Sequence, residues 1–171
     1  METITLETTK ETEKEAKAFP EVILEQTEKS VLETFGKIFG STERRPAREI
    51  ECRSWIKIAA LISFVGDINW SFGLVLPKES IEAMAQTFAG IEVDFESEEI
   101  ADIAGELANI VAGAISGNME SVGYNVQLSF PTIFRGEDYE QLIPHHFISE
   151  RQHYRANGYY FWLKMTVMDN F

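Results

Sequence analysis

The last third of the chain contains two strand-like segments joined by an Asn-Gly pair. Aromatic and β-branched residues lie on both sides of Asn157 and Gly158, within "HHFISERQHYRANGYYFWLKMTVM". Asn-Gly between two such runs is a strong signal for a hairpin with a type I′ turn. The chain is therefore expected to build antiparallel sheet, and its helices must bury their apolar faces against that sheet.

Further strands are expected in the middle of the chain. The segment "IECRSWIKIAALISFV" (50–65) is strand-like, and "INWSFGLVLP" follows it after a turn at Gly66-Asp67. The segment "YNVQLSFPTIF" (124–134) predicts a strand interrupted at Pro131, because proline cannot donate to a ladder. The segment "STERRPARE" (41–49) predicts a loop.

Three segments carry apolar residues at helical spacing. The first begins after Pro20 and stops at Gly40, and the second, "KESIEAMAQTFAG", is closed by Gly90. The third is expected to begin with Ser97 as its cap and to run to about residue 117. With about five or six strands, this pattern predicts an α+β fold in which about three helices cover a mostly antiparallel sheet.

Length and charge narrow the class of protein. The chain has 171 residues, of which 44% are hydrophobic, so it is long enough for one domain with a core. We expect a mobile acidic tail over residues 1–19 and a single domain over 20–171. A net charge of −13 argues against nucleic acid and anionic membrane as partners. Without a visible signal peptide, a cytoplasmic protein is expected.

The third helix carries an unusual polar stripe within "DIAGELANIVAG" (102–113). At about 100° per residue, Asp102, Glu106, Asn109 and Gly113 share one side, roughly opposite the apolar face. The flank formed by Ala101, Gly105, Ala108 and Ala112 makes the expected exposed side low in relief. Such a stripe could be an ordinary solvated face. However, two helical glycines cost on the order of 2 kcal/mol, and close approach of another surface is the usual reason for that cost.

The spacing of Asp102, Glu106, Asn109 and Gly113 resembles the signature of the CheC/CheX/FliY chemotaxis phosphatases, whose core is Glu-x-x-Asn. The preceding "LPKESIEAMAQTFAG" fits the same context. CheC-like members carry two such helices and CheX-like members carry one. The first 68 residues contain no Asn, so the first helix cannot present the motif. The chain therefore looks most like CheX, and the resemblance implies a CheC-like two-layer fold and a homodimer formed through the sheets.

The resemblance also implies a reaction. The partner is a phosphorylated CheY-like receiver domain, which stores phosphate on an Asp and supplies its own Mg²⁺ and Lys. Asn109 would position the attacking water, since an amide both donates and accepts hydrogen bonds, and Glu106 would pair with the receiver Lys. Asp102, Gly105 and Gly113 are candidate partner-binding residues. No cofactor of its own is expected.

Two non-enzymatic functions stay open at this point. One is a binding module of the same fold that docks a receiver or a flagellar switch partner without turnover. The other is an acidic dimeric adaptor that acts through residues 1–19, which deletion of that tail would separate from the others. The intact pair of Glu106 and Asn109 favours the enzyme.

Other notable residues favour structural roles. His145, His146 and His153 do not predict a metal site, because two residues adjacent in a strand point to opposite faces and the third is about 27 Å away along it. Arg44 and Arg45 are expected in a solvated loop or at an acidic partner's edge. Structural positions are also expected for Cys52, for Trp55, Trp70 and Trp162, and for the acids between Glu92 and Glu99, which could alternatively tune partner choice.

Overall fold

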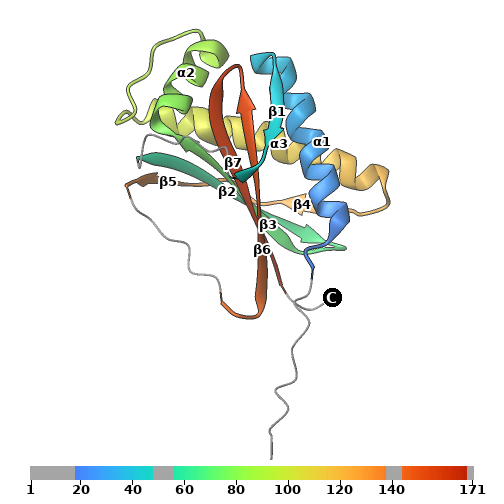
Figure 1. Cartoon of the computed structure of the whole chain (residues 1–171). Coiled ribbons are helices and arrows are strands. Elements are labelled where there is room, and N and C mark those ends of the chain that lie inside the picture. Colours follow the sequence, from blue (N-terminus) through green and yellow to red (C-terminus); the bar gives the residue numbers. More distant parts are fainter. Residues whose placement is uncertain (1–17, 48–55, 138–143, 169–171) are drawn as a thin grey trace, which may run out of the picture.

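Three helices cover one face of a seven-stranded antiparallel sheet (Figure 1). The computed structural model describes residues 18–47, 56–137 and 144–168. The strand order is β1-β6-β7-β3-β2-β4, and β5 also pairs with β2. The elements are α1 (Glu21–Phe39), β1 (Thr42–Arg45), β2 (Lys57–Gly66), β3 (Trp70–Pro77), α2 (Lys78–Ala89), α3 (Glu99–Ser121), β4 (Val126–Leu128), β5 (Thr132–Gly136), β6 (Phe147–Ala156) and β7 (Tyr159–Met168).

The predicted turns and helix ends are largely confirmed. Asn157 and Gly158 both adopt positive φ, at 46° and 88°, and join β6 to β7 as an Asn-Gly turn requires. Gly40 and Gly90 end the first two helices with φ of 86° and 74°. Strands β4 and β5 both pair with β2 on either side of Pro131, so the interrupted strand is also confirmed.

The predicted loop over 41–49 is wrong in its first half. Thr42–Arg45 forms β1, which pairs with β6 in the register that runs from Thr42↔Ala156 to Arg45↔His153. The four residues are polar and show no apolar alternation, so their sequence carries no strand signal. They form a strand because they pair with the open edge of β6. The strand count accordingly rises from the expected five or six to seven.

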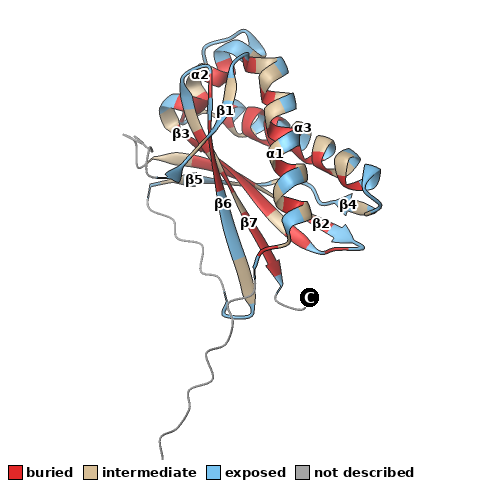
Figure 2. Ribbon diagram, turned by 45° about the vertical axis from the view of Figure 1, so that its right-hand side comes forward, coloured by how far each residue is buried: buried red, intermediate tan, exposed pale blue. Residues whose placement is uncertain are grey.

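The core lies between the helices and the inner face of the central strands (Figure 2). Every second residue of these strands points inward, as the pleat requires. A buried polar pair also joins the layers: Tyr154 Oη donates to Gln152 Oε1 (2.6 Å), and Gln152 Nε2 donates to the carbonyl of Leu24 in α1 (3.1 Å). The inward side chains of the central strands are Ile58, Ala60, Ile62, Phe64, Trp70, Phe72, Leu74, Leu76, Phe161, Leu163, Met165 and Val167.

Phe19, the last residue of the predicted tail, is buried in this core. Residues 1–17 of the predicted tail lie outside the described residues, as do Cys52, Trp55 and the first part of the predicted strand over 50–65. The tail therefore stays a prediction.

Candidate functional site

Helix α3 is held in the fold on three of its sides. It packs on β2 and β3 beneath it, on α1 and α2 within the helix layer, and on β4 and β5 at the sheet edge. By length and composition α3 could span a membrane, but half of that segment is buried inside the fold. Ten of its residues are buried: Ile100, Ile103, Ala104, Gly105, Leu107, Ala108, Val111, Ala112, Ile115 and Met119.

The fourth side of α3 is open and carries the predicted stripe. Asp102, Glu106, Asn109 and Gly113 are all exposed, and they follow one another at spacings of four, three and four residues. Within the described part of the chain, the three side chains make no hydrogen bond or ion pair. The carboxylates and the amide are therefore available to a partner.

The small-residue flank of the helix is not exposed, so this part of the interpretation is wrong. Gly105, Ala108 and Ala112 are buried. A Cβ placed on Gly105 would lie 3.5 Å from Ile133 Cδ1 and 3.7 Å from Pro131 Cγ, so the surface that approaches this glycine is the chain's own β5 and not a partner. Gly113 differs, because a Cβ there would meet open space.

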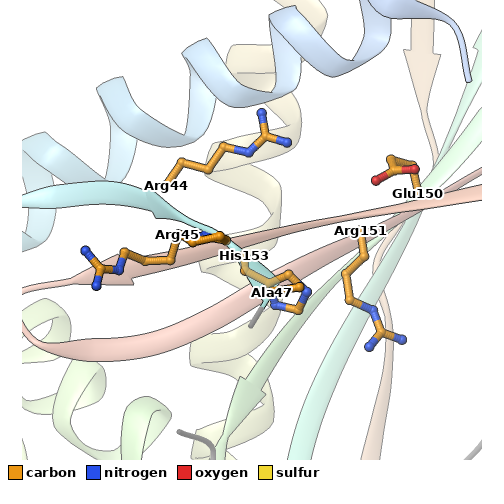
Figure 3. Close-up of a pocket in the computed structure, with 7 residues that line it drawn as sticks. Arg44, Arg45, Ala47, Glu150, Arg151 and His153 are labelled. Atoms are coloured by element: carbon orange, nitrogen blue, oxygen red, sulfur yellow. The ribbon is translucent and has the colours of Figure 1, made fainter. Parts of the chain in front are cut away.

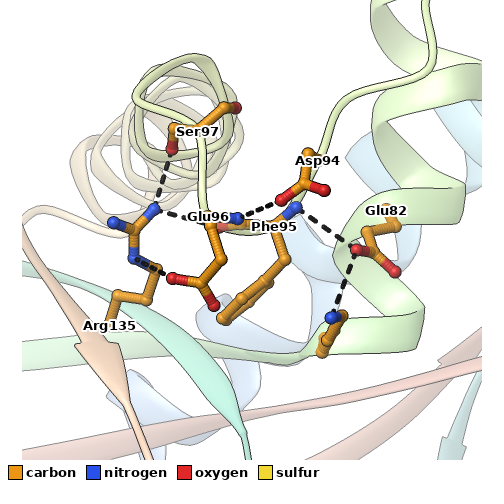
Figure 4. A network of polar contacts seen from close by, with 7 residues as sticks. Glu82, Asp94, Phe95, Glu96, Ser97 and Arg135 are labelled. Carbon is orange, nitrogen blue, oxygen red and sulfur yellow. Dashed lines mark hydrogen bonds and ion pairs between the residues drawn. The ribbon is translucent and has the colours of Figure 1, made fainter.

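A network of polar contacts fixes the segment that leads into α3 (Figure 4). Arg135 of β5 donates to the carbonyls of Phe95 (2.9 Å) and Ser97 (2.8 Å). On the other side, Glu82 of α2 accepts the backbone N–H of Phe95 (3.2 Å). The acidic segment between α2 and α3 is thereby tied to both neighbours, and the N-terminal end of the stripe is fixed in place.

The predicted Ser97 cap is not formed. The N-cap residue is Glu98, with no side-chain cap hydrogen bond, and its carbonyl accepts the N–H groups of Ala101 (3.0 Å) and Asp102 (3.3 Å). Glu99 lies in the first turn of α3, and its pKa is lowered chiefly by a hydrogen bond from its own backbone. Acids in the first turn complement the positive end of the helix dipole.

A pocket lies where the end of β1 pairs with β6, and its lining includes one histidine and three arginines (Figure 3). His153 lines this pocket, is 6% exposed, and has no hydrogen-bond partner for Nδ1. Burial lowers its pKa to about 4, and the charges of Arg151 and Arg44 add to the shift. The guanidinium groups of Arg44, Arg45 and Arg151 point away from one another, so they do not form a convergent anion site.

No side-chain cluster in the described residues suggests a metal centre. His145 and His146 are exposed beside the start of β6, whereas His153 is buried. No group of three or more His, Cys, Asp or Glu side chains could hold an ion within residues 18–47, 56–137 and 144–168. Trp70 is buried against Phe64, with ring centroids 4.1 Å apart, as expected of a core residue.

Comparisons with known proteins agree with this architecture. Residues 58–147, which include α3, match the family model of the chemotaxis phosphatase CheX. A comparison with curated protein sequences finds no match. The matched segment contains all of α3.

Solved structures of the same fold come from several bacteria. A CheC-like protein from Shewanella sp. PV-4 superposes with a TM-score of 0.69 at 15% identity, covering 86% of this chain and 98% of that one. CheX from Vibrio vulnificus gives 0.65 at 16% identity, covering 84% and 95%. CheX from Borrelia burgdorferi, solved with CheY, BeF₃ and Mg²⁺, gives 0.58 at 14% identity, covering 86% and 96%. The chain has the CheC-like fold and belongs to the CheX family.

Proposed function

We propose that this chain is a phosphatase that removes the phosphoryl group from the aspartate of a CheY-type receiver domain. The observation that carries the proposal is the open side of α3, where Glu106 and Asn109 stand exposed, one turn apart and without partners in the described chain. Membership of a family described as chemotaxis phosphatases and the complex of its Borrelia member with CheY support the same partner class.

The reaction needs little chemistry from this chain. A water attacks phosphorus, the bond between phosphorus and the receiver's carboxylate oxygen breaks, and inorganic phosphate leaves with the water's oxygen. The Asn109 amide accepts a hydrogen bond from the water and donates one from its NH₂ group, so it fixes the water without acting as a base. The receiver provides Mg²⁺ and charge stabilisation for the transferring group.

Glu106 has a different part in the proposal. Its carboxylate lies one turn before Asn109, on the same side of α3. By family resemblance it pairs with the receiver's active-site Lys and sets the register in which Asn109 enters the site. Asp102 and Gly113, at the two ends of the stripe, are proposed as partner contacts. Gly105 is not among them, because β5 covers it.

The deciding experiment measures phosphate release from CheY charged with acetyl phosphate. Asn109→Ala is expected to lower kcat by about 100-fold or more while binding to CheY is retained, because the water is no longer positioned. Glu106→Ala should lower phosphate release and, unlike Asn109→Ala, should also weaken binding to CheY. The matched control is Glu120→Ala, an exposed carboxylate on the same helix, about 20 Å from Glu106 along the axis.

Two outcomes would contradict the phosphatase proposal. Full activity in Asn109→Ala would remove its central residue. Binding of the wild-type chain to CheY with no acceleration of phosphate release would instead identify a docking module without turnover.

A further inference from the structure

Phe130 is the most exposed large apolar side chain in the described part of the molecule, at 94%. Its backbone is nevertheless well anchored. The N–H of Ser129 donates to the carbonyl of Ser63 (2.9 Å), the N–H of Ser63 donates to Ser129 Oγ (2.9 Å), and Ser129 Oγ donates to the carbonyl of Phe130 (3.0 Å). The ring therefore stands on a fixed piece of the sheet edge rather than on a loose loop.

The pairing register explains why the ring leaves the sheet. On one side of the interruption Leu128 pairs with Phe64, and on the other Thr132 pairs with Leu61. Three residues of the edge strand thus lie opposite two residues of β2, which is the arrangement of a bulge. Bulges at sheet edges redirect side chains and are frequent beside functional sites. Pro131 suits this position because it has no N–H to leave unpaired.

The bulge lies against the candidate site. Pro131 Cγ would be 3.7 Å from a Cβ on Gly105, and Phe130 is the residue next to Pro131. At about 100° per residue, Asn109 is the member of the stripe closest in angle to Gly105, about 40° away. Helical side chains also lean toward the N-terminus, which brings the Asn109 amide toward the same turn. Because Phe130 precedes Pro131 in the bulge, we place it beside the turn of α3 that carries Gly105 and Asn109.

The stripe itself has little surface from which affinity could come. Its members are two carboxylates, one amide and a glycine, and contacts between exposed charges contribute little free energy. Interfaces usually depend on a few buried aromatic or arginine side chains. A partner that covers Asn109 on the open side of α3 would also come close to Phe130.

We propose that Phe130 and its neighbour Leu128 form an apolar rim that the phosphorylated receiver domain covers when α3 enters its active site. The inference rests on the proposed function, and it adds Phe130 as the residue that supplies free energy for binding the receiver. Asn109 then contributes to the chemical step, and Phe130 contributes to association. The continuity of the rim with the open side of α3 favours the receiver over a second copy of the chain as the occupant.

The test compares Phe130→Ala with Phe134→Ala. Phe134 is on the same edge strand and is 48% exposed, but it pairs with Ala59 and follows Ile133, whose side chain faces Gly105, so it points to the opposite face of the sheet. Binding is measured with CheY loaded with beryllium trifluoride and Mg²⁺, and turnover with acetyl-phosphate-charged CheY. Phe130→Ala should weaken binding about tenfold and raise KM with kcat within about twofold of wild type, as removal of uniform binding does. Phe134→Ala should change neither, and Asn109→Ala should show the reverse split.

Two results would overturn the inference and leave the proposed function standing, and two further results bear on the proposed function itself. Unchanged binding by Phe130→Ala, with wild-type turnover intact, removes the rim and leaves the phosphatase. Dissociation of a dimer in Phe130→Ala, seen by light scattering, assigns the rim to a subunit contact. Wild-type binding without turnover would contradict the phosphatase proposal. Binding by Phe130→Ala and Phe134→Ala would then still show whether the receiver covers Phe130. Absence of wild-type binding overturns both.

Discussion

Helices α1 and α3 lie in the same layer and expose very different surfaces. The open face of α1 carries long charged side chains at every fourth position, namely Glu21, Glu25, Lys29, Glu33 and Lys37. Glu25 precedes Lys29 and Glu33 precedes Lys37 by four residues, the favourable order for helical ion pairs. The open side of α3 instead carries Asp102, Glu106, Asn109 and Gly113, of which only Glu106 is a long charged side chain.

The difference separates a face suited to water from the face that the proposed function assigns to a partner. Long charged side chains on α1 lose rotamer entropy when they are covered, which opposes binding. The residues of α3 lose less, and Gly113 leaves open space beside Asn109. Helix α1 contains no Asn and therefore cannot present the motif. It supports α3 from within the layer, since Asn118 Nδ2 donates to Ser30 Oγ (2.8 Å). One helix therefore presents the motif and the other helps to hold it.

The largest expected effect separates the two sides of α3 itself. Leu107 is fully buried, so Leu107→Ala should lower the free energy of unfolding by about 3 kcal/mol through lost burial and a cavity. Asn109→Ala, two residues away, should change it by less than about 0.5 kcal/mol, as surface substitutions do. Urea denaturation of the two variants measures both values. Equal destabilisation would show that Asn109 has a structural partner and that the two sides of α3 are not distinct.

The next effect is a loss of stability at low pH, and it should arise from His153 in the sheet rather than from α1 or α3. The pKa of His153 is about 4 in the folded protein, below its unfolded value near 6.5. The unfolded chain therefore binds the proton more tightly, and stability is full above pH 6.5 and falls as the pH drops toward 4. Between pH 7 and pH 5 the expected loss is about 2 kcal/mol.

Urea midpoints at the two pH values check this prediction with a matched pair of variants. His153→Gln should reduce the loss between pH 7 and pH 5, whereas His145→Gln, which replaces an exposed histidine, should leave it unchanged. An identical pH dependence in wild type and His153→Gln would assign the acid sensitivity to another group.

The smallest effect compares a glycine from each helix. A Cβ on Gly36 of α1 or on Gly113 of α3 would meet nothing within 4 Å, so replacement by Ala should raise stability by up to about 1 kcal/mol at each position. Only the α3 position should matter for docking. Gly113→Gln is expected to weaken binding of CheY loaded with beryllium trifluoride, while Gly36→Gln should not. Equal affinities for these two Gln variants would remove Gly113 from the proposed partner contacts.

Much of this fold could be predicted from the sequence, because turns and helix ends are local properties. Asn157-Gly158, Gly40 and Gly90 each specify a backbone conformation, and the structure adopts all of them. Strand β1 could not be predicted, because four polar residues pair only where β6 offers an open edge. The sequence pattern shows which residues alternate, but it does not show which strand edge is free.

The candidate site was predictable on one side only. A helical wheel correctly places Asp102, Glu106 and Asn109 on an exposed side. It fails for Gly105 and Ala108, because it assumes one covered face, whereas α3 is covered from three directions. Phe130 carried no signal at all, since an apolar residue in an edge strand is expected to be buried until the register shows the bulge. The roles of Glu106 and Asn109 stay predictions.

The contacts of Arg135 also determine when the protein loses conformational entropy. The segment between α2 and α3 is held by Arg135 and Glu82 before any partner arrives. Ordering a free segment of this kind costs about 1 kcal/mol or more per residue, and here the cost falls on folding. Each encounter with a partner then begins with the entry to α3 already in place, so repeated cycles of docking and release do not repeat the cost.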